Sequence, residues 1–180
     1  MMRFESKQQM PAFSILDING NEISNATLKG EKAYLVFNRF AGCPICNLRF
    51  HTIENEQNFF ETNKINVVSF YETSLPLLRE YVGNEMLNSA MVASPGSNIY
   101  KQFGVERSWL KLFKSFMKGG LKKVSEGNKL FKKIIKADGN MDRIGAEFLI
   151  DENGIIIFAH YHEFVGDDLP VEKLKELFLQ

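Results

Sequence analysis

Two cysteines, at positions 43 and 46, are the residues whose type and spacing are best suited to chemistry. The segment Cys43-Pro44-Ile45-Cys46 lies between an apolar run typical of a buried strand and a pattern typical of a helix. A helix N-terminus offers unpaired N–H groups and a positive dipole end, which can lower a thiol pKa from ~8.5 to ~3.5–7.5. The second sulfur lies one helical turn on, within reach of a disulfide. This pattern predicts thiol redox chemistry.

Two other uses of the cysteine pair stay open. A zinc site would need two more ligands, but the chain has no further cysteine, and His51, His160 and His162 lack the spacing of a zinc finger. Inert buried thiols are commoner among scattered cysteines than in a C-x-x-C that follows a strand. We therefore expect neither a metal nor an organic cofactor, and we expect Arg39 and Arg49 to add positive potential at the thiols.

The elements that must position the cysteines follow from the hydrophobic pattern. Continuous apolar runs at residues 33–37, 65–71 and 90–93 predict three buried strands, which alternate with predicted helices. This alternation indicates βαβ units and a parallel core. Around this core the pattern predicts a hairpin over residues 11–23, helices ending near residue 63 and spanning 75–87, a helical turn over 99–103, a second hairpin over 148–158 and a closing helix over 171–179.

Residues 107–136 interrupt this pattern and are strongly basic. They include ten Lys and Arg residues and one acid, Glu126. Apolar residues recur at helical spacing from Trp109 to Met117 and again over residues 130–135, which predicts two amphipathic basic helices separated by Gly119-Gly120. We expect their apolar stripes to pack on the core, with the lysines in solvent. The alternatives are attachment to a membrane surface, attraction of an anionic substrate or lipid, and docking of an acidic donor protein.

Length and composition set the frame for these elements. The chain has 180 residues, 44% of them hydrophobic, and its 22 basic and 22 acidic residues give a formal net charge of zero. This length predicts one domain over residues 1–180, with a helical insertion at about 107–140. The net charge argues against a nucleic-acid partner, although it conceals +9 within residues 107–136 and −9 elsewhere. Without a secretory signal or an apolar run of ~18 residues, we expect a cytoplasmic protein with reduced thiols.

Residues 37–46, Phe-Asn-Arg-Phe-Ala-Gly-Cys-Pro-Ile-Cys, resemble the active-site segment of the alkyl hydroperoxide reductase C/thiol-specific antioxidant proteins. These are the peroxiredoxins of the thioredoxin-like superfamily, and the likeness is to their C-x-x-C subtype. Residues 11–20 resemble the first hairpin of the family, residues 94–105 its D-P-x-G…A-x-x-Y-G-V stretch, and residues 148–156 its F-x-I-D-x-x-G-x-I hairpin. The resemblance implies an α/β, three-layer thioredoxin-like fold with a central mixed β-sheet flanked by helices, plus the basic helical insertion.

The resemblance also implies roles for four residues. On the P-x-x-x-T-x-x-C motif of peroxiredoxins, laid without gaps, Cys46 matches the cysteine that attacks peroxide, Cys43 the threonine and Arg39 the proline. Thioredoxin-like oxidoreductases instead attack with the first cysteine of C-x-x-C, here Cys43. The catalytic arginine of the family often precedes the F-x-I-D strand, where Arg143 is nearest, two residues early. The cis-proline of the oxidoreductases would fall near Ala146, and its absence favours a peroxidase-like or divergent activity over a general disulfide oxidoreductase.

The first hypothesis that the resemblance implies is a thiol peroxidase for hydrogen peroxide or organic hydroperoxides. One cysteine, Cys46 by the peroxiredoxin alignment, becomes a sulfenic acid, and Cys43 resolves it to a disulfide. Arg143 or Arg39 stabilises the departing oxygen, and a thiol donor such as a thioredoxin-like protein restores the dithiol. The alternatives are a protein disulfide oxidoreductase and a non-enzymatic redox-sensing or binding domain. A homodimer is a further expectation from the family.

Overall fold

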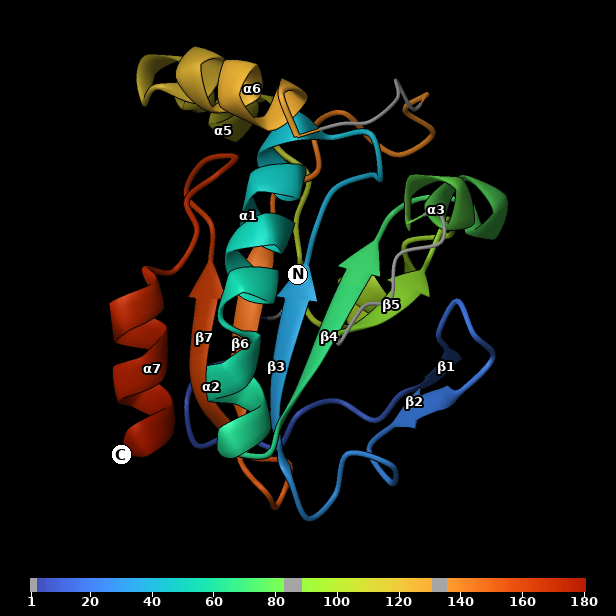
Figure 1. Cartoon of the computed structure of the whole chain (residues 1–180), viewed down its shortest axis with the longest axis vertical. Coiled ribbons are helices and arrows are strands. Elements are labelled where there is room, and N and C mark those ends of the chain that lie inside the picture. The colour runs from blue at the N-terminus through green and yellow to red at the C-terminus, as the bar shows by residue number, and fades with distance from the viewer. Residues whose placement is uncertain (1–2, 83–88, 131–135) are drawn as a thin grey trace.

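A five-stranded sheet forms the centre of the computed structural model, which describes residues 3–82, 89–130 and 136–180 (Figure 1). The three strands β3, β4 and β5 run parallel, whereas β6 and β7 run antiparallel to their neighbours. The predicted mixed sheet with a parallel core is confirmed. In spatial order the strands are β5 (Ala90–Ala93), β4 (Ile65–Tyr71), β3 (Lys32–Phe37), β6 (Ala146–Ile150) and β7 (Ile156–Tyr161).

Other elements cover both faces of this sheet. Successive residues of a strand point to opposite faces, so the apolar strand β3 contributes side chains to a core on each face. On β3, Tyr34 and Val36 face a core formed with α1, α2 and α7, whereas Leu35 and Phe37 face a core formed with α4 and the β1–β2 hairpin. This arrangement confirms the predicted three layers (Figure 1). These elements are β1 (Ser14–Leu16), β2 (Glu22–Ser24), α1 (Pro44–Asn55), α2 (Gln57–Thr62), α3 (Leu75–Val82), α4 (Asn98–Gln102) and α7 (Val171–Leu179).

The predicted elements differ from the observed ones mainly in helix bounds. The helical segment after the cysteines ends at Thr62, next to the Asn63 near which its end was expected, but a break at Glu56, with φ near −99°, divides it into α1 and α2. The helix predicted over residues 75–87 is described to Val82, and its last residues lie outside the described part of the chain. Both hairpins are confirmed, the first as β1–β2 and the second as β6–β7.

Two helices, α5 (Trp109–Met117) and α6 (Gly120–Asn128), lie in the described part of the basic segment, and we call this pair the cap. Gly119 separates them in the left-handed conformation, with φ of 84°, which glycine adopts readily. α6 lies before the apolar stripe of residues 130–135, over which the second helix was expected. Residues 131–135 of that predicted stripe lie outside the described residues. In Figure 1 the cap lies at one end of the molecule, above the start of α1.

The expectation that the apolar stripe of α5 packs on the core is wrong. Leu112 packs partly against the core and Ser115 is buried, so α5 turns inward the side that carries these two residues. The larger apolar side chains of the cap point to solvent, and we call them the outer face: Trp109, Leu110, Phe113, Phe116, Met117 and Leu121. Among the described residues, no helix combines the length and apolar character needed to cross a bilayer.

Candidate active site

The cysteine pair lies where β3 ends and α1 begins, at the carboxyl end of a central parallel strand. Cys43 is the N-cap residue of α1, and Pro44 follows at the first helical position, where its missing N–H costs little. Both thiols are free, and their residues are buried, with Cys43 0% and Cys46 7% exposed. The Cys46 thiol donates a hydrogen bond to Cys43 Sγ at 2.8 Å. The two sulfurs are thus placed to form a disulfide with little movement.

The surroundings of Cys43 favour its thiolate. Burial raises its pKa, but the hydrogen bond from the Cys46 thiol, the Arg39 charge and the backbone N–H of Cys46 together lower the pKa of Cys43 to about 6. That N–H lies 3.4 Å from Cys43 Sγ, and Nη1 of Arg39 lies 3.6 Å from it. Because this pKa is below 7, Cys43 is mostly ionised at neutral pH.

Cys46 is in the opposite state. Burial, the hydrogen bond to Cys43 and the negative charge of Cys43 all raise the pKa of the Cys46 thiol well above its ordinary value. The backbone N–H of Arg39 points at its sulfur from 3.4 Å. The pair therefore combines a thiolate with a protonated neighbour. The peroxiredoxin alignment assigns the attack to Cys46, whereas this order of pKa values favours Cys43, as in the thioredoxin-like alternative.

Arg39, in the loop after β3, supplies the guanidinium that contacts a cysteine sulfur. Its side chain is buried, donates to the Met141 carbonyl through Nη2 and to Cys43 Sγ through Nη1, and stacks on Phe40 with 5.0 Å from Cζ to the ring centroid. Its Nε–H has no hydrogen-bond partner among the described residues. A buried guanidinium 3.6 Å from a thiolate can stabilise negative charge that develops on an oxygen atom near the sulfur.

Arg143, the second predicted catalytic arginine, has a different position. Its guanidinium forms a two-pronged ion pair with Glu72, at 2.9 and 3.0 Å, and donates to the Val105 carbonyl at 2.7 Å. The backbone N–H of Glu72 in turn donates to the Arg39 carbonyl at 2.6 Å. Arg143 therefore connects the loop that contains Met141 to the end of β4 and to the loop of Arg39. This geometry supports a positioning role for Arg143.

A cavity of about 20 Å³ adjoins Cys46. Its lining includes Arg39, Gly145, His162 and Asp168. One water molecule needs about 10–15 Å³, so the cavity has room for one molecule of that size.

Arg49, expected to add positive potential at the thiols, instead takes part in a buried ion pair with Glu147. Its Nε lies 2.8 Å from Glu147 Oε1, and its Nη2 donates to the Tyr34 hydroxyl at 2.5 Å. Burial raises the pKa of Glu147, but the Arg49 charge and hydrogen bonds from His162 and the Leu169 N–H lower it to about 2. Glu147 was not among the residues predicted to be functional. Its carboxylate lies within an apolar strand, and this position indicates a buried basic partner.

This ion pair predicts a large stability effect. Arg49→Met is expected to lower the free energy of unfolding by about 3–5 kcal/mol, because it leaves the Glu147 charge buried without a partner. Urea denaturation followed by circular dichroism measures the change. Arg49→Met with Glu147→Gln is expected to recover most of the loss, since the uncharged amide still accepts from the Leu169 N–H. The control for this prediction is Lys173→Ala, which breaks an exposed ion pair with Glu176. This variant is expected to lower the free energy of unfolding by less than about 1 kcal/mol. Equal losses in Arg49→Met and Lys173→Ala would contradict the role given to the buried ion pair.

One group of side chains near this ion pair has the residue types of a metal site. Ligand atoms of Glu147, His162 and Asp168 lie within 4.8 Å of one another. Arg49 already supplies a positive charge 2.8 Å from one Glu147 oxygen, which makes the group suited to an ion pair rather than to a cation.

Comparisons with known proteins identify the family. The sequence profile described as the AhpC/TSA family matches residues 6–159. The chain belongs to the AhpC/TSA family. This membership confirms the resemblance seen around Cys43 and Cys46. The AhpC/TSA family consists of thiol redox proteins, so this chain is one of them. No curated protein matches the sequence significantly.

Solved structures similar to this AhpC/TSA protein confirm its thioredoxin-like fold. Peroxidoxin BcpB from Mycobacterium tuberculosis matches with a TM-score of 0.71 at 14% identity, over 98% of this chain and 97% of that one. A putative thiol:disulfide interchange protein DsbE from Chlorobium tepidum matches with 0.64 at 15% identity, over 99% and 97%. Thiol peroxidase from Chromobacterium violaceum matches with 0.62 at 11% identity, over 99% and 87%. At these identities the likeness shows the fold alone.

Proposed function

We propose that this AhpC/TSA protein is a thiol peroxidase whose nucleophile is Cys43. The observation that carries the proposal is the arrangement around one sulfur: an ionised Cys43, the Arg39 guanidinium at 3.6 Å and the protonated Cys46 at 2.8 Å. Family membership supports a peroxide as the oxidant and an external thiol as the reductant. The fold-level likeness to a peroxidoxin and a thiol peroxidase agrees with this class of reaction.

The reaction proceeds in three steps. The Cys43 thiolate attacks one oxygen of a peroxide ROOH, so that an S–O bond forms, the O–O bond breaks, and RO⁻ leaves and takes a proton from solvent. The Arg39 guanidinium, 3.6 Å from the sulfur, stabilises the charge on that oxygen. Cys46 then loses its proton and attacks the Cys43 sulfenic acid, whose hydroxide leaves with the proton as water. Two thiol–disulfide exchanges with a dithiol donor reduce the disulfide and release the oxidised donor.

Stoichiometric oxidation tests this function. Reduced protein treated with equimolar hydrogen peroxide is expected to lose two thiols per peroxide and to form an intramolecular Cys43–Cys46 disulfide, as thiol titration and mass spectrometry of the intact chain show. With dithiothreitol or thioredoxin as donor, peroxide consumption becomes catalytic. Protein that retains both thiols after this treatment would refute the peroxidase.

A second candidate function is a dithiol–disulfide oxidoreductase acting on protein partners. The order of pKa values favours it, because an ionised first cysteine of C-x-x-C is the attacking group in that chemistry. Insulin reduction that proceeds while peroxide leaves both thiols intact would support this function instead. A Cys46→Ser variant would then trap mixed disulfides with partner proteins through Cys43.

A further inference from the structure

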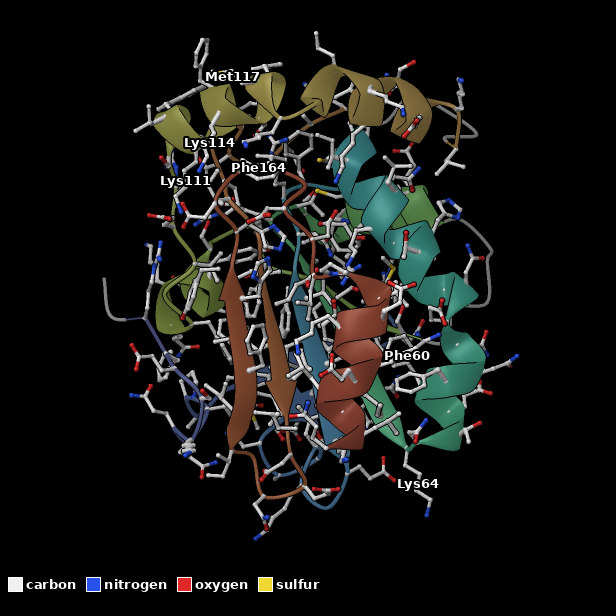
Figure 2. The ribbon with its side chains drawn as sticks, turned by 90° about the vertical axis from the view of Figure 1, so that its left-hand side faces the viewer. Phe60, Lys64, Lys111, Lys114, Met117 and Phe164 are labelled. Atoms are coloured by element: carbon white, nitrogen blue, oxygen red, sulfur yellow. The ribbon has the colours of Figure 1, made fainter. Side chains whose placement is uncertain are left out.

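The outer face of the cap exposes an unusual amount of apolar surface. Trp109 is 65% exposed, Leu110 79%, Phe113 64%, Met117 77% and Leu121 68%. They come from two consecutive helices at one end of the molecule, and in Figure 2 Met117 lies at that end, on the side away from the sheet. Contiguous large apolar side chains in solvent commonly mark a surface that binds something.

The orientation of the cap is fixed by contacts on its inward side. The buried Ser115 hydroxyl accepts from the Val165 N–H at 2.7 Å and donates to the Lys111 carbonyl at 3.0 Å. Gly127 of α6 lies so close to the first turn of α1 that an added Cβ would be 2.0 Å from the Pro44 carbonyl oxygen. The outer face therefore cannot turn inward without breaking these contacts.

Basic side chains share the cap with this apolar surface. Lys118, Lys122 and Lys129 are exposed, and between residues 107 and 130 the sequence has seven basic residues and one acid. That acid, Glu126, lies 3.9 Å from Lys122, and these two charges offset each other, which leaves the charges of Lys118 and Lys129. Other lysines are turned inward, such as Lys111, which pairs with Glu106 at 2.8 Å and Glu163 at 3.1 Å. The outward charge of the cap is thus positive.

Charge and composition decide between the possible occupants. A second copy docked by the same face would place lysines opposite lysines, because a two-fold interface pairs a surface with itself. An anionic lipid surface instead offers negative headgroups for the lysines and acyl chains for Trp, Phe, Leu and Met side chains. Two adjacent short helices at the end of the molecule can lie in such an interface together.

We propose that the outer face binds anionic phospholipid bilayers peripherally. The apolar side chains of α5 and the start of α6 enter the boundary between headgroups and acyl chains, and the exposed lysines contact the phosphates. The binding site is separate from the thiol chemistry and does not depend on the proposed peroxidase function.

Trp109 provides a direct readout, because it is the single tryptophan of the chain and belongs to the outer face. With vesicles of phosphatidylcholine and phosphatidylglycerol, the reduced full-length protein is expected to float with the lipid and to shift its tryptophan emission to the blue. Vesicles of phosphatidylcholine alone are expected to bind it at least about tenfold more weakly, and added salt is expected to release it.

Matched variants make the test specific. Phe113→Ser with Met117→Ser is expected to weaken partitioning by about tenfold or more, since two apolar side chains that would enter the bilayer are lost. Leu16→Ser with Leu179→Ser removes two comparably exposed leucines outside the cap and is expected to leave partitioning unchanged. Circular dichroism confirms that both proteins fold.

Three results would overturn the proposal. The first is no flotation and no emission shift with anionic vesicles at low salt. The second is equal binding by Phe113→Ser/Met117→Ser and wild type. The third is an emission shift with soluble poly-glutamate or on self-association but none with vesicles, which would assign the outer face to an acidic protein or to a second copy.

Discussion

Replacing Cys43 by serine is expected to lower the rate of peroxide consumption by roughly 1000-fold or more, the order lost when a nucleophile is removed. The reason is the difference between the two thiols: Cys43 is ionised near neutral pH, and the pKa of Cys46 is raised by burial and by its neighbour. Stopped-flow oxidation with hydrogen peroxide in a single turnover measures this rate.

Cys46→Ser is the matched variant for this experiment. A serine hydroxyl can still donate to Cys43 Sγ, so the first oxidation is expected to stay within about tenfold of wild type. Turnover with dithiothreitol is expected to lose the disulfide intermediate, and the Cys43 sulfenic acid accumulates and reacts with dimedone. If Cys46→Ser abolishes the first oxidation and Cys43→Ser retains it, the roles are those of the peroxiredoxin alignment.

Arg39→Gln is expected to produce the second large effect, by moving the pH dependence of the reaction. Removing a positive charge 3.6 Å from the sulfur raises the pKa of Cys43 from about 6 toward the ordinary thiol value. A pKa of about 8 would lower the thiolate fraction at pH 7 about tenfold, so the rate falls by the same factor there and recovers at alkaline pH. The pH profiles of thiolate absorbance and oxidation rate measure the shift.

The sign of the linked stability change follows from the lowered pKa. The reduced wild-type protein gains stability from the Cys43 thiolate above the unfolded thiol pKa, and it loses that gain as pH falls toward about 6. This pH dependence is expected to shrink in Arg39→Gln. Arg39→Lys is expected to retain part of the shift, and Arg3→Gln, which removes an exposed charge paired with Glu106, is the matched control. A thiol titration that is identical in Arg39→Gln and wild type would contradict the role of Arg39.

The sequence was informative where local pattern determines structure. A buried central strand appears as a continuous apolar run, and Cys43-Pro44-Ile45-Cys46 directly after it is placed by chain connectivity at the N-terminus of a helix. Arg39 lies in the same short loop, so its closeness to the thiols follows from the same connectivity. These local relations were enough to predict the thiol site and the sheet around it.

Relations between distant residues were not visible in this way. The partners of Arg49 and Arg143 are Glu147 and Glu72, which lie 98 and 71 residues away in the chain, and periodicity does not report such pairing. Periodicity also does not show which side of a helix faces the core. A stripe at helical spacing shows only that the helix is amphipathic. In α5, the buried Ser115 and its bond to Val165 decide that.

The cap adds positive charge at one end of a chain whose formal net charge is zero, which gives the molecule an electric dipole. Residues 107–130 contain seven basic residues and one acid, while the negative excess is spread over the rest of the chain. A neutral dipole does not migrate in a uniform field, but it rotates in one. Near a negatively charged surface such a molecule arrives with its cap first, and salt weakens this orientation over a distance of about 10 Å at 0.1 M. The net charge therefore governs drift, and the dipole governs which end makes the first contact.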